Sequence, residues 1–242
     1  MQGLSPKGSI VILTGAGISV ESGLPSFRGA GGLWHGHRLE EVATPEAFAR
    51  QPHLVQRFYD ERRRQLLAED IAPNKAHAAL AELERRWAGD VLLITQNIDD
   101  LHERAGSTSI IHMHGEILKA RCLNCDAVIP WRDDLGVAHT CPACSAADRL
   151  RPHIVWFGEM PLELDRIYTV LEGADLFLAI GTSGQVYPAT GFVQAVNEIG
   201  RARSIELNLE PSAVHGQFDE QRIGPATETV PKLVDELLRI GS

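Results

Sequence analysis

SIVILTGAGISVESG, residues 9–23, begins as an apolar run and ends in a glycine-rich turn. Short apolar runs rich in isoleucine and valine and bounded by glycine are typical of strands that are buried on both faces of a parallel sheet. Glycines at such a turn let backbone N–H groups approach a pyrophosphate at the start of a following helix, although Val20 stands where the third glycine of the G-x-G-x-x-G fingerprint would be. The stretch predicts a strand, a turn and a helix, and leaves open whether the turn binds a nucleotide or is only structural.

The same pattern, an apolar run that ends in a small or polar residue, recurs at 91–97, 109–115, 153–158, 175–183 and 204–210. Each run is followed by a helix-like stretch, and this alternation predicts an α/β fold built on a doubly wound, parallel, Rossmann-like sheet. Ligands bind open sheets of this kind outside the carboxyl ends of the strands, so binding residues are expected just after these runs. Residues 227–240 are expected to form a closing helix with Pro231 at its start.

Two segments interrupt the alternation. Residues 34–74 contain no strand signal and carry apolar residues at helical spacing, namely Phe48, Leu54, Val55, Phe58 and Leu66. Residues 118–152 hold all four cysteines and too few apolar residues for a core of their own. We expect these two segments, a helical insertion and a zinc-ribbon module, to form a small domain beside a Rossmann-like domain made of 1–33, 75–117 and 153–242.

Zinc is expected because the cysteines form two C-x-x-C pairs, Cys122 with Cys125 and Cys141 with Cys144. Two such pairs supply four thiolates, the ligand set of a closed tetrahedral zinc site, whereas a catalytic zinc keeps one position open. We therefore expect one structural Zn²⁺ that takes no part in bond-making. The alternative interpretation, four reduced and buried cysteines, needs both pairs to arise by chance.

Composition limits the class of protein. The chain has 242 residues, of which 23 are basic and 32 acidic, so its net charge is −9 and non-specific binding to nucleic acid is not expected. No apolar stretch reaches the roughly 18 residues that a membrane span needs. The first residues, MQGLSPKGSI, show neither a secretory signal nor an Arg-rich transit peptide. We expect a cytoplasmic protein that is a monomer and does not bind membranes.

Seven motifs follow one another along the chain: GAGISVESGLPSFRG, TQNIDDLH, HGE, the two C-x-x-C pairs, VWFGE, GTSGQVYPA and NLE. In this order they resemble the sirtuins, NAD-dependent protein lysine deacylases, over nearly the whole chain from Ile10 to Leu237. The segment RPHIVWFGEMP is most similar to the bacterial members and to the branch that includes desuccinylases. The resemblance implies a Rossmann-like NAD-binding domain, NAD as co-substrate, and acylated lysine side chains of proteins as substrates.

The resemblance also implies which residues bind. NAD is expected to contact Gly15, Ala16, Gly17, Ser19, Phe27, Arg28, Gln96, Asn97, Ile98, Asp99, Gly181, Thr182, Ser183, Asn208, Leu209, Glu210 and Ala226. The acylated peptide is expected to lie as an added strand between 155–159 and 184–186. It is expected to contact Tyr59, Arg62, Val155, Phe157, Gly158, Glu159 and Val186. An alternative role for Asp99 is that of an acid at the start of a helix.

His114 is the expected general base. A neutral imidazole with a pKa of about 6.5 accepts a proton from a ribose hydroxyl at cellular pH. The family places this base directly before a glycine, which selects His114 and leaves His112 and His102 as structural residues, although spacing alone also allows a metal pair of those two. In the implied mechanism the acyl oxygen attacks C1′ of the nicotinamide ribose and nicotinamide leaves. His114 then activates a ribose hydroxyl to attack the resulting imidate, and water releases the amine. The products are free lysine, nicotinamide and O-acyl-ADP-ribose.

Tyr59 and Arg62 decide the expected range of acyl groups. At i and i+3 they share one face of a helix, and in the desuccinylase branch a tyrosine and an arginine at this spacing line the acyl pocket. An arginine fork binds a carboxylate bidentately and a phenol adds one donor, which suits succinyl- and malonyl-lysine. Removal of acetyl groups is expected as well. Three consecutive arginines would otherwise indicate a solvated basic face, and this interpretation stands for Arg63 and Arg64.

Two other functions remain open. A mono-ADP-ribosyltransferase would use the same NAD site with a different nucleophile. A binding module would contact nucleic acid through the zinc segment and only sense NAD, but residues 119–151 carry five basic and four acidic side chains and no basic stripe.

Overall fold

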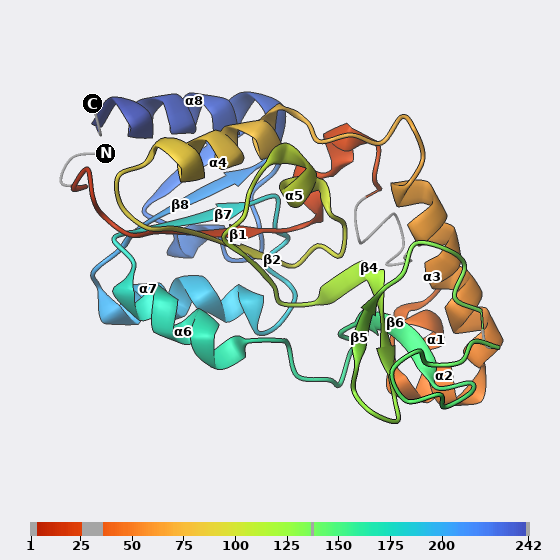
Figure 1. Ribbon diagram of the computed structural model, residues 1–242. Helices are drawn as coiled ribbons and strands as arrows, with labels where there is room; N and C mark the ends of the chain where they lie inside the picture. The colour runs from red at the N-terminus through yellow and green to blue at the C-terminus, as the bar shows by residue number, and fades with distance from the viewer. Residues whose placement is uncertain (1–3, 26–35, 137, 241–242) are drawn as a thin grey trace.

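The computed structural model describes residues 4–25, 36–136 and 138–240. A six-stranded parallel sheet, in the order β3-β2-β1-β7-β8-β9, has helices on both faces (Figure 1). Its strands are β1 (Ile10–Thr14), β2 (Val91–Thr95), β3 (Ile110–His112), β7 (Leu176–Ile180), β8 (Arg203–Asn208) and β9 (Glu220–Ile223). A smaller antiparallel sheet, β5-β4-β6, consists of β4 (Gly115–Cys122), β5 (Val128–Pro130) and β6 (Leu150–Ile154). The expected α/β fold with a parallel sheet is confirmed.

β1 shows why its sequence is a continuous apolar run. Ile10 and Ile12 face one layer of helices, Val11 and Leu13 face the other, and none of the four is more than 3% exposed. Burial of such a side chain contributes about 1.5–3 kcal/mol, so a strand covered on both faces favours an apolar residue at every position. The covering helices are α4 (Lys75–Arg86) and α8 (Ala226–Ile240) on one face, and α6 (Leu164–Gly173) and α7 (Phe192–Ile199) on the other.

The assignment of residues 153–158 to the parallel sheet is wrong. Its first residues end β6, which pairs antiparallel with β4 in the small sheet, with Ile154 opposite Gly115. A short apolar run does not reveal which strand it pairs with, because its partner comes from elsewhere in the chain. Three strands, β4, β5 and β9, have no counterpart among the predicted runs. β9 lies at the sheet edge and is alternately half-buried and exposed, so its sequence, EQRI, lacks an apolar run.

Two helix predictions also need correction. The glycine-rich turn continues into two 3₁₀ turns, η1 (Ala16–Ile18) and η2 (Val20–Ser22), rather than into an α-helix. The closing helix α8 begins at Ala226, so Pro231 lies inside the helix and not at its start. A proline has no N–H to donate to the carbonyl of Thr227 one turn earlier, so it signals a helix start more often than a helix interior.

The helical insertion is confirmed by α1 (Leu39–Val42), α2 (Pro45–Arg50) and α3 (Pro52–Leu66). Thr44 accepts a hydrogen bond from the backbone N–H of Ala47 at 3.0 Å and so caps α2. Val55, Phe58 and Leu66 are buried in one hydrophobic cluster with residues of the small sheet and of α5 (Leu101–Ala105). Elsewhere in the described residues, 3₁₀ turns occur at η4 (Ala189–Gly191) and η5 (His215–Gln217). The insertion therefore packs against the small sheet.

The small sheet extends beyond both ends of the expected zinc module, residues 118–152. It begins at Gly115 and ends at Ile154, whereas the expected division gives 115–117 and 153–154 to the Rossmann-like part. The division into domains itself stays a prediction. Among the described helices, none combines the length and the apolar character needed to cross a membrane.

Candidate active site

A cavity of about 580 Å³ lies where β1, β2, β7 and β8 end, with α3 and the residues that follow β6 on its other side. From β1 the chain adds β2 and β3 on one side of the sheet, whereas β7, β8 and β9 follow on the other side of β1. Open α/β sheets bind ligands at such a reversal of strand order, here between β1 and β7. The volume is within the range of about 300–1,000 Å³ that is typical of cofactor and substrate sites.

The structure brings most of the expected site residues to this cavity. Of the expected NAD residues, those that line it are Gly15, Ala16, Gly17, Ser19, Gln96, Asn97, Ile98, Asp99, Gly181, Thr182, Ser183, Asn208, Leu209 and Glu210. The expected peptide-binding residues line it too: Tyr59, Arg62, Val155, Phe157, Gly158, Glu159 and Val186. Ala226 is not part of the lining, because it begins α8 and packs against the core. Phe27 and Arg28 lie outside the described residues.

The glycine-rich turn brings the ends of β1 and β7 into close contact. A Cβ atom at Gly15 would lie 2.7 Å from the carbonyl oxygen of Gly181, and one at Gly17 would lie 2.7 Å from the Cα of Gly181. Gly181 itself has a φ of 63°, a left-handed conformation that favours glycine. The glycines are therefore required by the close packing of this turn, and the same turn forms one wall of the cavity. Nucleotide binding by the turn stays a prediction.

Asn97, Ser19 and Asp99 form a buried network at the floor of the cavity. Asn97 Nδ2 donates to Ser19 Oγ at 3.2 Å, and Ser19 Oγ donates to Asp99 Oδ2 at 3.1 Å. The N–H of Leu101 donates to Asp99 Oδ1 at 3.1 Å, so Asp99 also bonds to the start of α5, as its alternative role predicts. Burial raises the pKa of Asp99 to about 6 although both hydrogen bonds oppose this.

One hydrogen bond orients the imidazole of His114. Its Nδ1 lies 3.0 Å from the carbonyl oxygen of Gln96. A carbonyl only accepts, so Nδ1 carries the hydrogen and Nε2 keeps the lone pair. Burial lowers the pKa of His114 although the bond to Gln96 opposes this. The ring is therefore neutral at pH 7, in the tautomer that a general base at Nε2 requires.

His112 and His102, the histidines expected to be structural, both have partners in the structure. His112 Nε2 lies 2.5 Å from a carboxylate oxygen of Glu103, and this pairing raises the pKa of His112 against the effect of burial. His102 Nε2 lies 3.1 Å from Thr14 Oγ1, and its ring packs against His77. Among the described residues, the group around His112 that has metal-binding geometry contains Glu103 and Glu116 but not His102. The structure therefore does not bring His102 and His112 together as a metal pair.

Tyr59 and Arg62 lie on the wall of the cavity that α3 provides. Tyr59 is buried, its Oη accepts a hydrogen bond from Trp156 Nε1 at 2.9 Å, and burial raises its pKa. The side chain of Arg62 is 11% exposed and its guanidinium packs 3.7 Å from the centre of the Phe58 ring. Arg62 Nη1 donates to Phe58 O at 2.7 Å and to Glu61 at 3.0 Å, whereas the buried Nε has no partner among the described residues.

The interpretation of Arg63 as part of a solvated basic face is wrong. Arg63 is fully buried, where its Nη1 pairs with Asp60 at 2.5 Å and its Nε donates to Ile117 O at 3.0 Å. Arg64, in contrast, is exposed and pairs with Asp134 at 3.1 Å. Successive helix residues point about 100° apart, so three consecutive arginines face the cavity, the small sheet and the solvent in turn.

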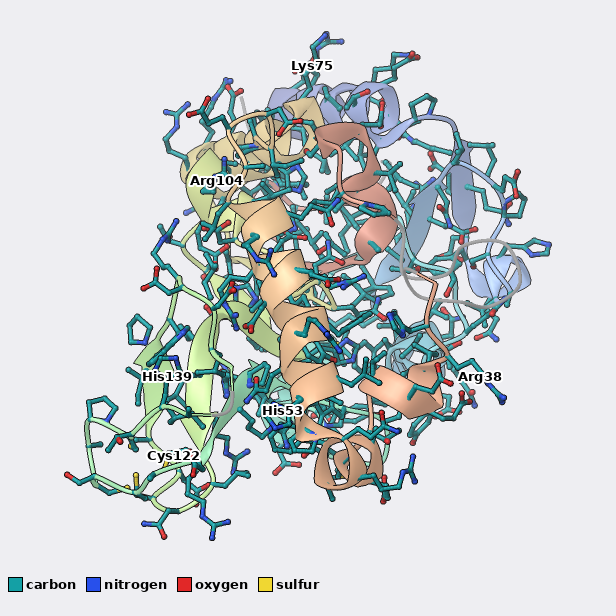
Figure 2. All side chains as sticks on the ribbon, turned by 90° about the vertical axis from the view of Figure 1, so that its right-hand side faces the viewer. Arg38, His53, Lys75, Arg104, Cys122 and His139 are labelled. Carbon is teal, nitrogen blue, oxygen red and sulfur yellow. The ribbon has the colours of Figure 1, made fainter. Side chains whose placement is uncertain are left out.

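The four cysteines lie together, and Cys122 among them ends β4 of the small sheet (Figure 2). All four Sγ atoms are within 4.8 Å of one another, with 3.7 Å between Cys122 and Cys144 and 3.9 Å between Cys125 and Cys141. Zn–S bonds of about 2.3 Å give a tetrahedron with edges of about 3.8 Å, so these two separations match a zinc site and the four thiols are compatible with zinc. None of the four lines the cavity, which agrees with a structural role for a metal here.

Comparison with known proteins identifies the family. The sequence pattern of the Sir2 family matches residues 15–188. The chain belongs to the Sir2 family. A protein of Pasteurella multocida named NAD-dependent protein deacylase is 56% identical to this sirtuin over 229 residues, 95% of this chain and 97% of that one. A protein of the same name from Vibrio parahaemolyticus is 57% identical over 235 residues, 97% of each chain.

Solved structures share the fold of this sirtuin. A Sir2 homologue in complex with NAD has a TM-score of 0.86 and 40% identity, over 97% of this chain and 91% of that one. A mutant Sir2 homologue in complex with 2′-O-acetyl ADP ribose has a TM-score of 0.86 and 39% identity, over 97% and 93%. Sir2Af2 bound to a myristoylated histone peptide has a TM-score of 0.75 and 33% identity, over 97% and 93%. The resemblance found in the sequence is confirmed.

Several residues that line the sirtuin's cavity were not expected there. They include Gln65, Pro161 and Tyr187, whereas Trp156 and Gln185 lie in the two segments expected to flank the peptide but were not among the expected contacts. Gln65 follows Arg62 by three residues on α3, so helical spacing places it on the same face as Arg62. Trp156 lies inside the VWFGE motif, but nothing in the sequence indicates that its indole contacts Tyr59.

Proposed function

We propose that this NAD-dependent protein deacylase removes acetyl groups and also succinyl and malonyl groups from lysine side chains, with nicotinamide and O-acyl-ADP-ribose as the other products. One observation carries the proposal: Arg62 and Tyr59 lie on the wall of the cavity that also contains His114 and the expected NAD residues. A cation and a phenol at this position suit an acyl chain that ends in a carboxylate.

The surroundings of Arg62 support a carboxylate ligand. Burial lowers the pKa of its guanidinium, and pairing with Glu61 opposes this only in part. Glu61 is half exposed, so water screens its charge. An incoming carboxylate would add an opposite charge in the buried part of the site, where a charge-assisted hydrogen bond is strongest.

The chain's own residues perform the proton steps. When bound, NAD supplies an ADP-ribosyl group that accepts the acyl oxygen as nicotinamide leaves. Gln96 holds the Nδ1–H of His114, and His114 Nε2 takes the proton from a ribose hydroxyl as that hydroxyl attacks the acyl carbon. Asn97 and Asp99 lie beside the same cavity with amide and carboxylate groups that suit ribose and carboxamide partners.

The substrate peptide is proposed to lie between 155–159 and 184–186. Residues of both segments line the cavity. Pairing through main-chain groups gives affinity with little sequence preference. The peptide-bound structure of Sir2Af2 supports an acylated peptide as the class of ligand.

Replacement of Arg62 tests the acyl range. A charge-assisted hydrogen bond is worth roughly 1.5–3 kcal/mol, so Arg62→Met should lower kcat/KM for a succinyl peptide by about ten- to a hundredfold, far more than for the acetyl peptide. Mass spectrometry of one peptide sequence carrying each acyl group, with NAD, measures both. Arg64→Met, which removes the exposed neighbouring arginine, is the matched control and should change neither rate.

Two results would contradict the proposal. Equal losses on the succinyl and acetyl peptides in Arg62→Met would remove the carboxylate-binding role. ADP-ribose attached to the peptide, in place of O-acyl-ADP-ribose in solution, would instead indicate a mono-ADP-ribosyltransferase.

A further inference from the structure

A buried chain of contacts leads from Tyr59 to the loop after β6. Trp156 Nε1 donates to Tyr59 Oη at 2.9 Å, and both side chains are buried. The guanidinium of Arg151 stacks on Trp156, with Cζ 3.5 Å from the centre of the ring. Arg151 also donates two hydrogen bonds to Glu159, Nη1 to Oε1 at 2.7 Å and Nη2 to Oε2 at 2.9 Å. The four side chains form one connected unit that ends at the phenol of the proposed acyl pocket.

The carboxylate of Glu159 accepts hydrogen bonds from two members of this unit. It accepts the backbone N–H of Trp156 at 2.8 Å in addition to the two bonds from Arg151. Burial acts to raise the pKa of Glu159, but these bonds hold it below its usual range. Glu159 is among the residues expected to bind the peptide. Because its carboxylate is paired with Arg151, we expect its backbone, rather than its side chain, to face the peptide.

The contact between Trp156 and Tyr59 sets the direction of the phenol hydrogen. An indole N–H can only donate, so Tyr59 Oη is the acceptor in this contact and its own hydrogen donates in another direction. An acyl carboxylate can only accept. The orientation of the indole therefore decides whether Tyr59 offers a carboxylate its hydrogen or its lone pairs.

We propose that Arg151 is a positioning residue for acyl selectivity. Its two hydrogen bonds to Glu159 and its stacking on Trp156 hold the indole in place, so that Tyr59 donates its hydrogen to an acyl group that ends in a carboxylate. This inference rests on the proposed removal of succinyl and malonyl groups. Lysine at position 151 would keep the positive charge but lose both the planar stack and the paired donors.

Kinetics of three variants test the inference. Arg151→Lys, Trp156→Phe and the double variant are compared with the unmodified enzyme on succinyl and acetyl peptides of one sequence, with NAD. Each single variant should raise KM for the succinyl peptide and lower the succinyl-to-acetyl ratio of kcat/KM by roughly three- to tenfold, the effect of one hydrogen bond. Because Arg151 acts through Trp156, the double variant should lower this ratio no further than Trp156→Phe does.

A second measurement does not depend on activity. The indole N–H signal of Trp156, identified by its loss in Trp156→Phe, should exchange with solvent faster in Arg151→Lys, because the ring is no longer held by the stack. Arg166→Lys makes the same substitution in an exposed pair with Glu163 and is the matched control for both measurements.

The outcomes separate this inference from the proposed function. Equal losses on both peptides in Arg151→Lys, or additive effects on the ratio in the double variant, would indicate a merely structural role and overturn the inference. Loss of succinyl removal in Arg62→Met together with an unchanged ratio in Arg151→Lys would overturn it while the proposed function stands. An unmodified enzyme that does not remove succinyl groups would overturn both.

Discussion

At the scale of single residues, His114 is held in the tautomer of a general base by its bond to Gln96. His114→Ala should lower deacylation by about 10²- to 10⁴-fold, the usual contribution of general-base catalysis. Affinity for NAD, measured by calorimetry, should change little, since the imidazole is proposed to act on a ribose hydroxyl during the reaction. Near-normal turnover with normal NAD affinity would show that the base lies elsewhere, and His112 would be tested first.

Asp99 links one residue to the pH dependence of stability. Burial raises its pKa from 3.8 to about 6, so the folded state holds this proton more tightly than the unfolded chain does. Ionisation of Asp99 therefore costs stability, and the cost is absent below about pH 4, grows between pH 4 and 6 and is complete above. Asp99→Asn should thus stabilise the fold by about 1–3 kcal/mol at pH 7 and by little at pH 4.

Urea unfolding of both proteins at the two pH values measures this difference. The stabilised variant should bind NAD less well if the carboxylate has the expected role, a common cost at functional sites. A variant that is less stable at pH 7, or equally stabilised at both pH values, would show that ionised Asp99 is not strained by its burial.

At the scale of elements, α3 presents different residues to different neighbours. Tyr59 and Arg62 line the cavity, whereas Asp60 and Arg63 bind the small sheet and its loop. Asp60 pairs with Arg63 and also accepts the backbone N–H groups of Leu135 and Gly136, at 2.8 and 3.2 Å. The position of the proposed acyl pocket therefore depends on a buried ion pair on the adjacent face of the same helix.

Removal of this ion pair should be costly. Asp60→Ala leaves Arg63 buried without its carboxylate partner, so we expect a loss of about 3–5 kcal/mol in the free energy of unfolding. Asp134→Ala breaks the exposed pair with Arg64 and should cost about 0–1 kcal/mol. Urea unfolding compares the two, and equal losses would show that the buried pair contributes no more than a surface contact.

At the scale of the whole molecule, the cavity has one wall from each sheet, so it depends on a small sheet that has little core of its own. The cluster around the cysteines contains few buried apolar side chains, among them Ala120, Leu135 and Leu150. We expect about one zinc per chain, and we expect chelation to unfold the segment around β5 and to lower deacylation, although no cysteine lines the cavity.

Metal analysis and hydrogen exchange measure these effects. After chelation, amide exchange should increase across residues 120–150 and remain slow in α8, which packs on the far side of the parallel sheet. A pure protein with much less than one zinc per chain, or a chelated protein with unchanged exchange in this segment, would contradict the prediction.

Local sequence patterns were sufficient for most elements, and the resemblance to the sirtuins selected most of the expected residues that line the cavity. A strand buried on both faces favours apolar residues throughout, which is why the run from Ile10 predicted β1 correctly. Parallel strands present their carboxyl ends at one edge, so residues that follow separate runs, such as Gln96 and Gly181, reach one cavity. Helical spacing placed Tyr59 and Arg62 on one wall.

Only the tertiary structure decided features that depend on residues distant in sequence. The run at 153–158 leaves the parallel sheet because β4 is its partner, and hydrogen bonding between strands is non-local. Arg63 is buried because the small sheet covers one face of α3, which no property of three consecutive arginines indicates. The pKa of Asp99 is raised because the folded chain buries its carboxylate, which its sequence position does not indicate either. A residue's own pattern determines the element it forms, whereas its partners, its dielectric surroundings and its charge depend on what the fold packs against it.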